Sequence, residues 1–399
     1  MDGIKRRELL KATAMGSVAF SMGGTRGLFA ASEARAHGES PQPGAWPNRR
    51  LLDPLGIEHP IVQAPMAGHT SPEMPVAVCE AGGLGSFPCA LLTPAQVRDE
   101  VGKIRTQTRR PLNLNFFCHP TSRRDPVIEG AWRQKLAVYY DEVTIPSPEY
   151  PGSSLPPFGA EMCETVVGLR PEVVSFHFGV PEKTLIDRLK AAGCRIFSTA
   201  TTVAEARWLE DHGADAVIAQ GIEAGGHRGT FLATDPASQV GTFALVPQVV
   251  DAVKVPVIAA GGIADGRGIA AAMALGASAV QLGTAYLLCP EASISAHHRV
   301  ALKSARDNHT VVTNVLTGLP ARVFMNRIAR ELGPLATEVP AFPLPAIVLA
   351  PLRIQAESMG STDFSALYAG QAAALARELP AGGLTLKLAD EAMARLSSG

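Results

Sequence analysis

The chain has 399 residues, and its 36 Lys and Arg against 37 Asp and Glu give a formal net charge of −1. This balance predicts no nucleic-acid partner, because proteins that bind polyanions carry a clear excess of basic residues. Apolar residues make up 46% of the chain and charged residues 18%, which excludes an intrinsically disordered protein and predicts a large hydrophobic core.

The N-terminal residues have the order of an export signal. Residues 5–7 are basic, residues 12–24 form an uncharged and moderately apolar run, and residues 34–36 have the A-x-A form of a cleavage site. Two arginines followed by two leucines and a lysine resemble a twin-arginine signal. We therefore predict a signal peptide over 1–36, a linker over 37–50 and an exported, periplasmic protein. A cytoplasmic protein with a basic N-terminal tail is the alternative.

The remaining composition predicts neither a membrane span nor a metal site. The apolar runs are shorter than the roughly 20 residues that a membrane-spanning helix needs. The six cysteines are scattered without a C-x-x-C pair, which indicates neither a zinc site nor a disulfide framework.

Short apolar runs alternate with helix-like stretches along the rest of the chain. The predicted strands are 61–64, 84–87, 112–116, 173–176, 195–198, 216–219, 257–260 and 279–282. The clearest helix patterns between them are 181–192, 203–212, 243–253 and 266–275. Strands that lack strict alternation are typical of parallel sheets buried on both faces. Eight such units indicate an α/β protein with a (β/α)8 TIM barrel.

Two of the intervals between strands are unusually long. The interval from 112 to 173 predicts an inserted loop over the C-terminal face of the barrel, and the interval from 216 to 257 contains the glycine-rich segment 221–241. We assign 51–305 to the barrel domain. Residues 306–399 are predicted to be a small helical extension that packs on it.

Glycine turns follow the seventh and eighth predicted strands, at Gly261-Gly262 and at Gly283. Backbone N–H groups at such turns bind anions, and in barrels these two loops are the usual phosphate site. The pair favours a cofactor with one terminal phosphate, such as FMN, although glycines that only form tight turns are the alternative. No GxGxxG follows a strand, so a Rossmann domain is not expected.

His177 stands at the C-terminal end of the fourth predicted strand, where inward side chains reach the active site of a barrel. Its phenylalanine neighbours exclude water, which favours a catalytic base over an ordinary buried histidine. After the sixth strand, Gln220 is placed to bind the edge of a heterocycle. His227 and Arg228 follow and are candidates to hold an anionic substrate, with a solvated loop as the alternative.

The chain resembles the FMN-dependent nitronate monooxygenases of class I, formerly called 2-nitropropane dioxygenases. The resemblance covers roughly residues 50–375. The matching segments are 63–68, 81–85, 113–119, 175–179, 220–229, 281–285, 320–322, 326–327, 360–364 and 369–371. His69 departs from the family pattern, which usually has a glycine there, and so do Cys79-Glu80.

The resemblance implies that FMN binds at the barrel mouth and that O2 oxidises alkyl nitronates, such as propionate 3-nitronate, to a carbonyl compound and nitrite. Some members also accept neutral nitroalkanes. By motif position the catalytic histidine is His177. The implied cofactor contacts are Pro65, Met66, Asn115, Gln220, Gly225, Gly262, Gln281, Leu282, Gly283 and Thr284.

Two alternatives stay open. An FMN-dependent enoyl-acyl-carrier-protein reductase shares the barrel, the flavin and a Glu-Ala-Gly-Gly-His loop, but it needs NADH and an acyl carrier, which do not suit an exported protein. A non-catalytic flavin-binding protein is the second alternative. The sequence does not fix the oligomeric state, and a homodimer is possible.

Overall fold

The computed structural model describes residues 45–121, 123–150, 155–232, 235 and 238–398. The predicted signal peptide lies outside these residues. The chain divides into two units, Met1–Ser40 and Pro41–Gly399, and all the described residues belong to the second. Within them, no helix is long and apolar enough to cross a membrane.

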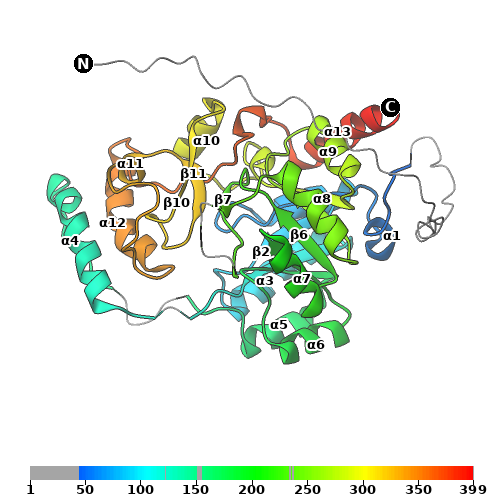
Figure 1. Ribbon diagram of the computed structural model, residues 1–399, viewed down its shortest axis with the longest axis horizontal. Helices are drawn as coiled ribbons and strands as arrows, with labels where there is room; N and C mark the ends of the chain where they lie inside the picture. Colours follow the sequence, from blue (N-terminus) through cyan, green and yellow to red (C-terminus); the bar gives the residue numbers. More distant parts are fainter. Residues whose placement is uncertain (1–44, 122, 151–154, 233–234, 236–237, 399) are drawn as a thin grey trace, which may run out of the picture. The chain divides into compact units, whose positions relative to one another are not determined.

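Eight parallel strands form a barrel in Pro41–Gly399 (Figure 1). They are β1 (Ile61–Gln63), β2 (Gly85–Pro88), β3 (Leu112–Phe117), β4 (Val173–His177), β5 (Arg195–Ala200), β6 (Ala216–Gln220), β8 (Val257–Ala260) and β9 (Ala279–Leu282). They pair in the order β1-β9-β8-β6-β5-β4-β3-β2, and a parallel bridge between Val62 and Leu84 joins the two outer members. The predicted (β/α)8 fold is confirmed, with strand ends shifted by a residue or two.

Helices cover the outside of the barrel. They are α1 (Leu52–Leu55), α2 (Glu73–Glu80), α3 (Pro94–Gln107), α5 (Ala160–Leu169), α6 (Lys183–Ala191), α7 (Val203–Asp211), α8 (Thr242–Ala252) and α9 (Gly266–Ala274). Several begin at a residue whose side chain accepts a backbone N–H, such as Thr202 before α7 and Asp265 before α9. The strands are apolar throughout because their side chains alternate between the barrel interior and this helical layer; in β4, Val173, Val174 and Phe176 are all fully buried.

The last helix of the chain, α13 (Ala381–Leu396), completes the helical layer. It contacts both α9 and α2. It therefore occupies the place in the helical layer that a helix directly after β9 would take. Leu384 and Leu388 are buried in the main core, and the Tyr286 hydroxyl lies 2.8 Å from Oγ1 of Thr385. The barrel therefore draws its helices from both 51–305 and 306–399.

The tail between β9 and α13 contains strands as well as helices. Its helices are α10 (Ala296–Lys303), α11 (Arg327–Glu331) and α12 (Leu344–Ser358). Its strands β10 (Thr310–Thr313) and β11 (Ala321–Phe324) pair antiparallel, and β11 also pairs with β7 (Gly226–His227), in the loop after β6. The sequence predicts only helices here, because strands this short show too few alternations to be recognised.

The segment after β3 was expected to be a loop, and instead it carries the helix α4 (Pro126–Glu142). Trp132, Leu136, Tyr139 and Tyr140 share one helical face and are buried in a core that they form with the tail. Figure 1 shows α4 beside α12 and away from α3 and α5, its neighbours in sequence. The insert and the tail therefore form one packed region next to the barrel.

Candidate functional site

A cavity of about 810 Å³ lies at the C-terminal ends of the barrel strands. It is lined by the loops after β1, β6, β8 and β9 and by parts of the tail. Of the residues predicted from the sequence, the cavity wall contains Pro65, Met66, Asn115, His177, Gln220, Gly225, His227, Gly262, Gln281, Gly283 and Thr284. The side chain of Leu282 is 1% exposed and packs into the main core instead. Arg228 also does not line the cavity.

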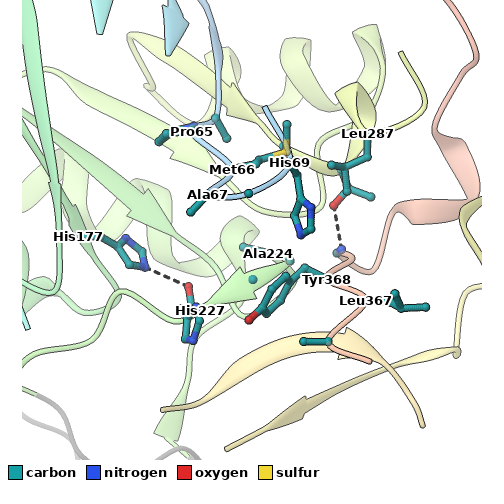
Figure 2. A pocket seen from close by; sticks show the side chains of 18 of the residues that line it. Pro65, Met66, Ala67, His69, His177, Ala224, His227, Leu287, Leu367 and Tyr368 are labelled. Atoms are coloured by element: carbon teal, nitrogen blue, oxygen red, sulfur yellow. Dashed lines mark hydrogen bonds between the residues drawn. The ribbon is translucent and has the colours of Figure 1, made fainter. Parts of the chain in front are cut away.

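His177 is held at both ring nitrogens. Its Nε2 lies 3.1 Å from the carbonyl oxygen of His227 (Figure 2). Its Nδ1 lies 3.1 Å from Oγ1 of Thr199. A carbonyl oxygen only accepts hydrogen bonds, so in the neutral ring Nε2 carries the proton and donates it. The lone pair is then at Nδ1 and accepts from the Thr199 hydroxyl.

The surroundings of His177 keep its ring neutral. The rings of Phe178 and Phe117 lie 4.6 and 6.2 Å from it, centroid to centroid. Burial lowers the pKa of His177 to about 4, and the nearby Arg228 charge adds to this. Burial also lowers the pKa of His227, to about 3. Both imidazoles therefore retain a basic lone pair at neutral pH.

The His227 carbonyl is shared with Gln220. The Gln220 amide donates from Nε2 to this carbonyl over 3.0 Å, and its Oε1 accepts from the backbone N–H of Gly229 over 2.8 Å. Gly229 has to be glycine, because a Cβ there would lie 2.8 Å from Cε1 of His177. Gln220 thus fixes the loop after β6, in addition to lining the cavity.

Arg228 lies behind the cavity wall and is 1% exposed. Its guanidinium donates to the carbonyl oxygens of Gln220 (2.7 Å) and Gly221, and to Oε1 of Gln239 (2.8 Å). Burial lowers its pKa to about 10, so it stays charged at neutral pH. The predicted role of Arg228 as a direct substrate ligand is not what the structure favours, because its donors are used to hold the end of β6.

The two glycine turns present backbone N–H groups to the cavity. Gly261 and Gly262 have φ values of 113° and 68°, which favour glycine. Within the described ranges, the N–H groups of Gly262, Ile263 and Thr284 donate to no backbone or side-chain oxygen. Unpaired N–H groups at two adjacent strand ends form a site suited to a phosphate.

Several residues of the tail line the cavity although the sequence did not predict them as site residues. His298 and Tyr368 lie near His69, with ring centroids 5.3 and 5.9 Å from it, and Tyr368 also lies 5.6 Å from His227 (Figure 2). A bridge between Val323 and Tyr368 places the tyrosine, so no local sequence signal marks it. Thr199 could have been predicted from the sequence, because it stands near the C-terminal end of a strand.

In the ranges that the structure describes, no group of three or more His, Cys, Asp or Glu side chains is arranged to hold a metal ion. The six cysteines are free thiols, and five of them are buried.

Comparisons with a family model and with known protein sequences both find nitronate monooxygenases. A family model described as nitronate monooxygenase matches residues 48–391. The nitronate monooxygenase of Paraburkholderia phytofirmans is 41% identical over 346 residues, which cover 86% of this chain and 94% of the relative. That of Pseudomonas aeruginosa is 42% identical over 344 residues, which cover 84% of this chain and 97% of the relative.

Solved structures with a similar fold include related enzymes. A nitroalkane oxidase from Streptomyces ansochromogenes has a TM-score of 0.80 and 40% identity, and the match covers 88% of this chain and 99% of that one. FabK from Thermotoga maritima has a TM-score of 0.65 and 29% identity, with coverage of 89% and 98%. The similarity to the nitroalkane oxidase is greater in both sequence and structure.

We expect the buried histidines to make the protein less stable in mild acid. His298 is 1% exposed, and its Nε2 donates to the carbonyl of Tyr368 over 2.9 Å. Burial, and then the neighbouring His69, lower its pKa to about 4. Between this value and about 6.5 the unfolded chain binds a proton that the folded chain does not, so stability falls as the pH falls through this window.

The substitution His298→Gln keeps an N–H donor for Tyr368 but removes the titrating ring. Between pH 7 and pH 5 the free energy of unfolding of the variant should fall by about 2 kcal/mol less than that of the original protein. Urea unfolding at the two pH values measures the difference. An equal fall in both proteins would contradict the effect of burial on His298.

Proposed function

Since the chain belongs to the nitronate monooxygenase family, we propose that it is an FMN-dependent enzyme that uses O2 to oxidise alkyl nitronates to a carbonyl compound and nitrite. The observation that carries the proposal is one cavity that combines a pair of glycine turns suited to a phosphate with a neutral, partly buried histidine. The first feature suits the cofactor, and the second suits removal of a proton from carbon next to it.

The residues of the cavity fit FMN. The N–H groups of Gly262, Ile263 and Thr284 would hold the phosphate. Gly225 allows the loop after β6 to pack directly on the tail beside this site, because a Cβ there would lie 2.5 Å from the backbone nitrogen of Gly370. Gln281 lines the same wall, and within the described residues its buried Oε1 has no hydrogen-bond partner. An amide with unfilled hydrogen-bonding capacity is suited to a polar ligand. FMN supplies the transfer of electrons from the nitronate to O2.

The protein contributes a flavin site closed by apolar side chains. Pro65 and Met66 line the cavity at the end of β1, and Asn115 lines it at the end of β3. Nδ2 of Asn115 donates to the hydroxyl of Ser175 over 3.0 Å, which fixes the amide and leaves its Oδ1 for a ligand. These side chains would hold the ring system of FMN and exclude water from it.

His177 handles the proton when the substrate is a neutral nitroalkane. Its Nε2 proton is held by the His227 carbonyl, so the α-proton has to be taken at Nδ1 after the Thr199 hydroxyl turns away from that atom. An anionic nitronate has already lost this proton. For that substrate no proton has to be removed at His177.

The proposal is tested by mixing the purified protein, loaded with FMN, with ethyl nitronate and following O2 uptake and nitrite. We expect both signals, and no oxidation of NADH when a crotonyl thioester is supplied instead. NADH oxidation without nitrite formation would support an enoyl-acyl-carrier-protein reductase. Bound flavin with neither activity would support a non-catalytic binding protein.

The role of His177 is tested with His177→Asn, whose amide can still donate to the His227 carbonyl but has no basic nitrogen. For nitroethane, kcat/KM should fall by about 10²-fold to 10⁴-fold, the usual contribution of a general base. For preformed ethyl nitronate it should stay within about tenfold, because no proton has to be removed. Flavin content, read from the absorbance of the purified variant, should not change. Equal losses for both substrates would contradict the assignment.

We further propose that residues 1–36 direct export by the twin-arginine route. The sequence order of basic residues, apolar run and A-x-A site supports this. Replacing Arg6 and Arg7 together with lysine should move the protein from the periplasmic to the cytoplasmic fraction, measured by cell fractionation and immunoblotting. An unchanged distribution would contradict the twin-arginine route.

A further inference from the structure

Thr199 lines the cavity next to His177. It stands on β5, one residue beyond the last position at which this strand pairs with β4, Ser198 with Phe176. Its side chain is 4% exposed and forms part of the cavity wall. Within the described residues, its hydroxyl has one hydrogen-bond partner, Nδ1 of His177, over 3.1 Å. A hydroxyl group of the wall is therefore in contact with the atom that acts as the base.

The packing of Thr199 fixes its oxygen atom but leaves its hydroxyl hydrogen free to turn. A Cβ at Gly229 would lie 2.5 Å from Cγ2 of Thr199, so the methyl group packs directly on the backbone of the loop after β6. A β-branched side chain with its methyl group packed in this way is stiff about the Cα–Cβ bond. The hydroxyl hydrogen still rotates about the Cβ–Oγ1 bond. Oγ1 thus stays beside Nδ1 of His177, while its hydrogen can point to Nδ1 or to a ligand in the cavity.

The other polar side chains at this end of the cavity donate to protein atoms. Nε2 of His177 donates to the carbonyl of His227, and so does the Gln220 amide, over 3.0 Å. The Asn115 amide donates to the carbonyl and to the hydroxyl of Ser175, over 3.2 and 3.0 Å. An imidazole or an amide held in this way cannot be redirected without moving the whole side chain. The Thr199 hydroxyl can be redirected by one bond rotation.

Removal of a proton from the substrate changes what Thr199 can donate to. When the α C–H bond of a nitroalkane breaks, the proton binds to Nδ1 of His177. The electron pair of that bond forms a C=N double bond, and the negative charge moves to the nitro oxygens. Nδ1 then has no lone pair left to accept from the Thr199 hydroxyl, whereas the nitro oxygens have become stronger acceptors. A donor that turns from the first to the second frees the base and stabilises the charge that forms.

We propose that Thr199 is a further catalytic residue, whose hydroxyl turns away from Nδ1 of His177 and donates to an oxygen of the nitro or nitronate group. The inference rests on the proposed function and adds a substrate contact to it. An anionic nitronate carries the negative charge when it arrives, so Thr199 also contributes to its binding. The positive charge of Arg228, which acts on His177 from behind the cavity wall, favours an anion at the same place.

Turnover by two variants gives the first test. Thr199→Val keeps the shape of the side chain without the hydroxyl and should lower kcat/KM for nitroethane and for ethyl nitronate by about 10-fold to 100-fold, the usual loss for a hydrogen bond to a charged group. Thr199→Ser keeps the hydroxyl and should stay close to the original values. Thr165→Val is the matched control, because Thr165 is a buried threonine of α5 that does not line the cavity. Equal losses in the valine and serine variants would overturn the inference.

A double substitution separates contact with the substrate from an effect that passes through the histidine. In the His177→Asn variant the imidazole is absent, so a threonine that only holds the ring has nothing left to do. Adding Thr199→Val to this variant should still lower kcat/KM for ethyl nitronate by about tenfold or more. No further loss would show that Thr199 acts only through His177 and would overturn its contact with the substrate.

Binding is measured separately from turnover with nitrate, a planar anion whose negative charge is shared among oxygen atoms bonded to nitrogen, as in a nitronate. The Kd of nitrate, from its perturbation of the flavin absorbance, should rise by about tenfold or more in Thr199→Val and not in Thr199→Ser or Thr165→Val. The same Kd in Thr199→Val and in the original protein would overturn the inference. If the original protein oxidises no nitronate, the proposed function fails instead, and the nitrate titration still tests Thr199.

Discussion

The carbonyl oxygen of His227 is the atom on which the arrangement of the site depends. It accepts from Nε2 of His177, which stands on β4, and from the Gln220 amide, which stands at the end of β6. The first bond selects the tautomer that leaves a basic lone pair at Nδ1. The second joins the loop after β6 to the strand that precedes it. One backbone group therefore sets both the protonation pattern and the position of the loop.

The same loop connects the barrel to the tail. Gly226 and His227 form β7, which pairs with β11 through Arg322 and Ala321. The backbone N–H of Arg228 also donates to the carbonyl of Pro320 over 2.8 Å. The tail is thus held against the barrel mouth by the segment that positions His177. Because α12 belongs to this tail, the cavity wall that α12 forms is fixed by the same pairing that fixes the loop beside His177.

Much of this architecture could be predicted from the sequence, because the strands of a barrel are buried on both faces and appear as short apolar runs. His177 could be found because it ends one of those runs, and the glycine turns because they follow two others. The sequence does not predict the helix α4, although Trp132, Leu136 and Tyr139 have helical spacing, because the proline-rich sequence on its C-terminal side is typical of a loop. Tyr368 could not be predicted as a cavity residue, because its position is set by a backbone bridge to Val323, which no local sequence pattern encodes.

Arg228 illustrates the remaining limit of sequence reasoning. An arginine in a glycine-rich loop at a barrel mouth can face the substrate or the protein, and only the fold decides. In this chain it faces the protein, where it bonds to the carbonyls at the end of β6 and lowers the pKa of His177 from behind the wall. The charge of Arg228 therefore acts on the cavity through its electric field, and the guanidinium group does not line the cavity. A single negative charge near His177 benefits from that field. Burial keeps the imidazoles of His177 and His227 neutral at neutral pH, so the attraction of an anion to this end of the cavity is supplied by a buried guanidinium, that of Arg228, and not by the histidines.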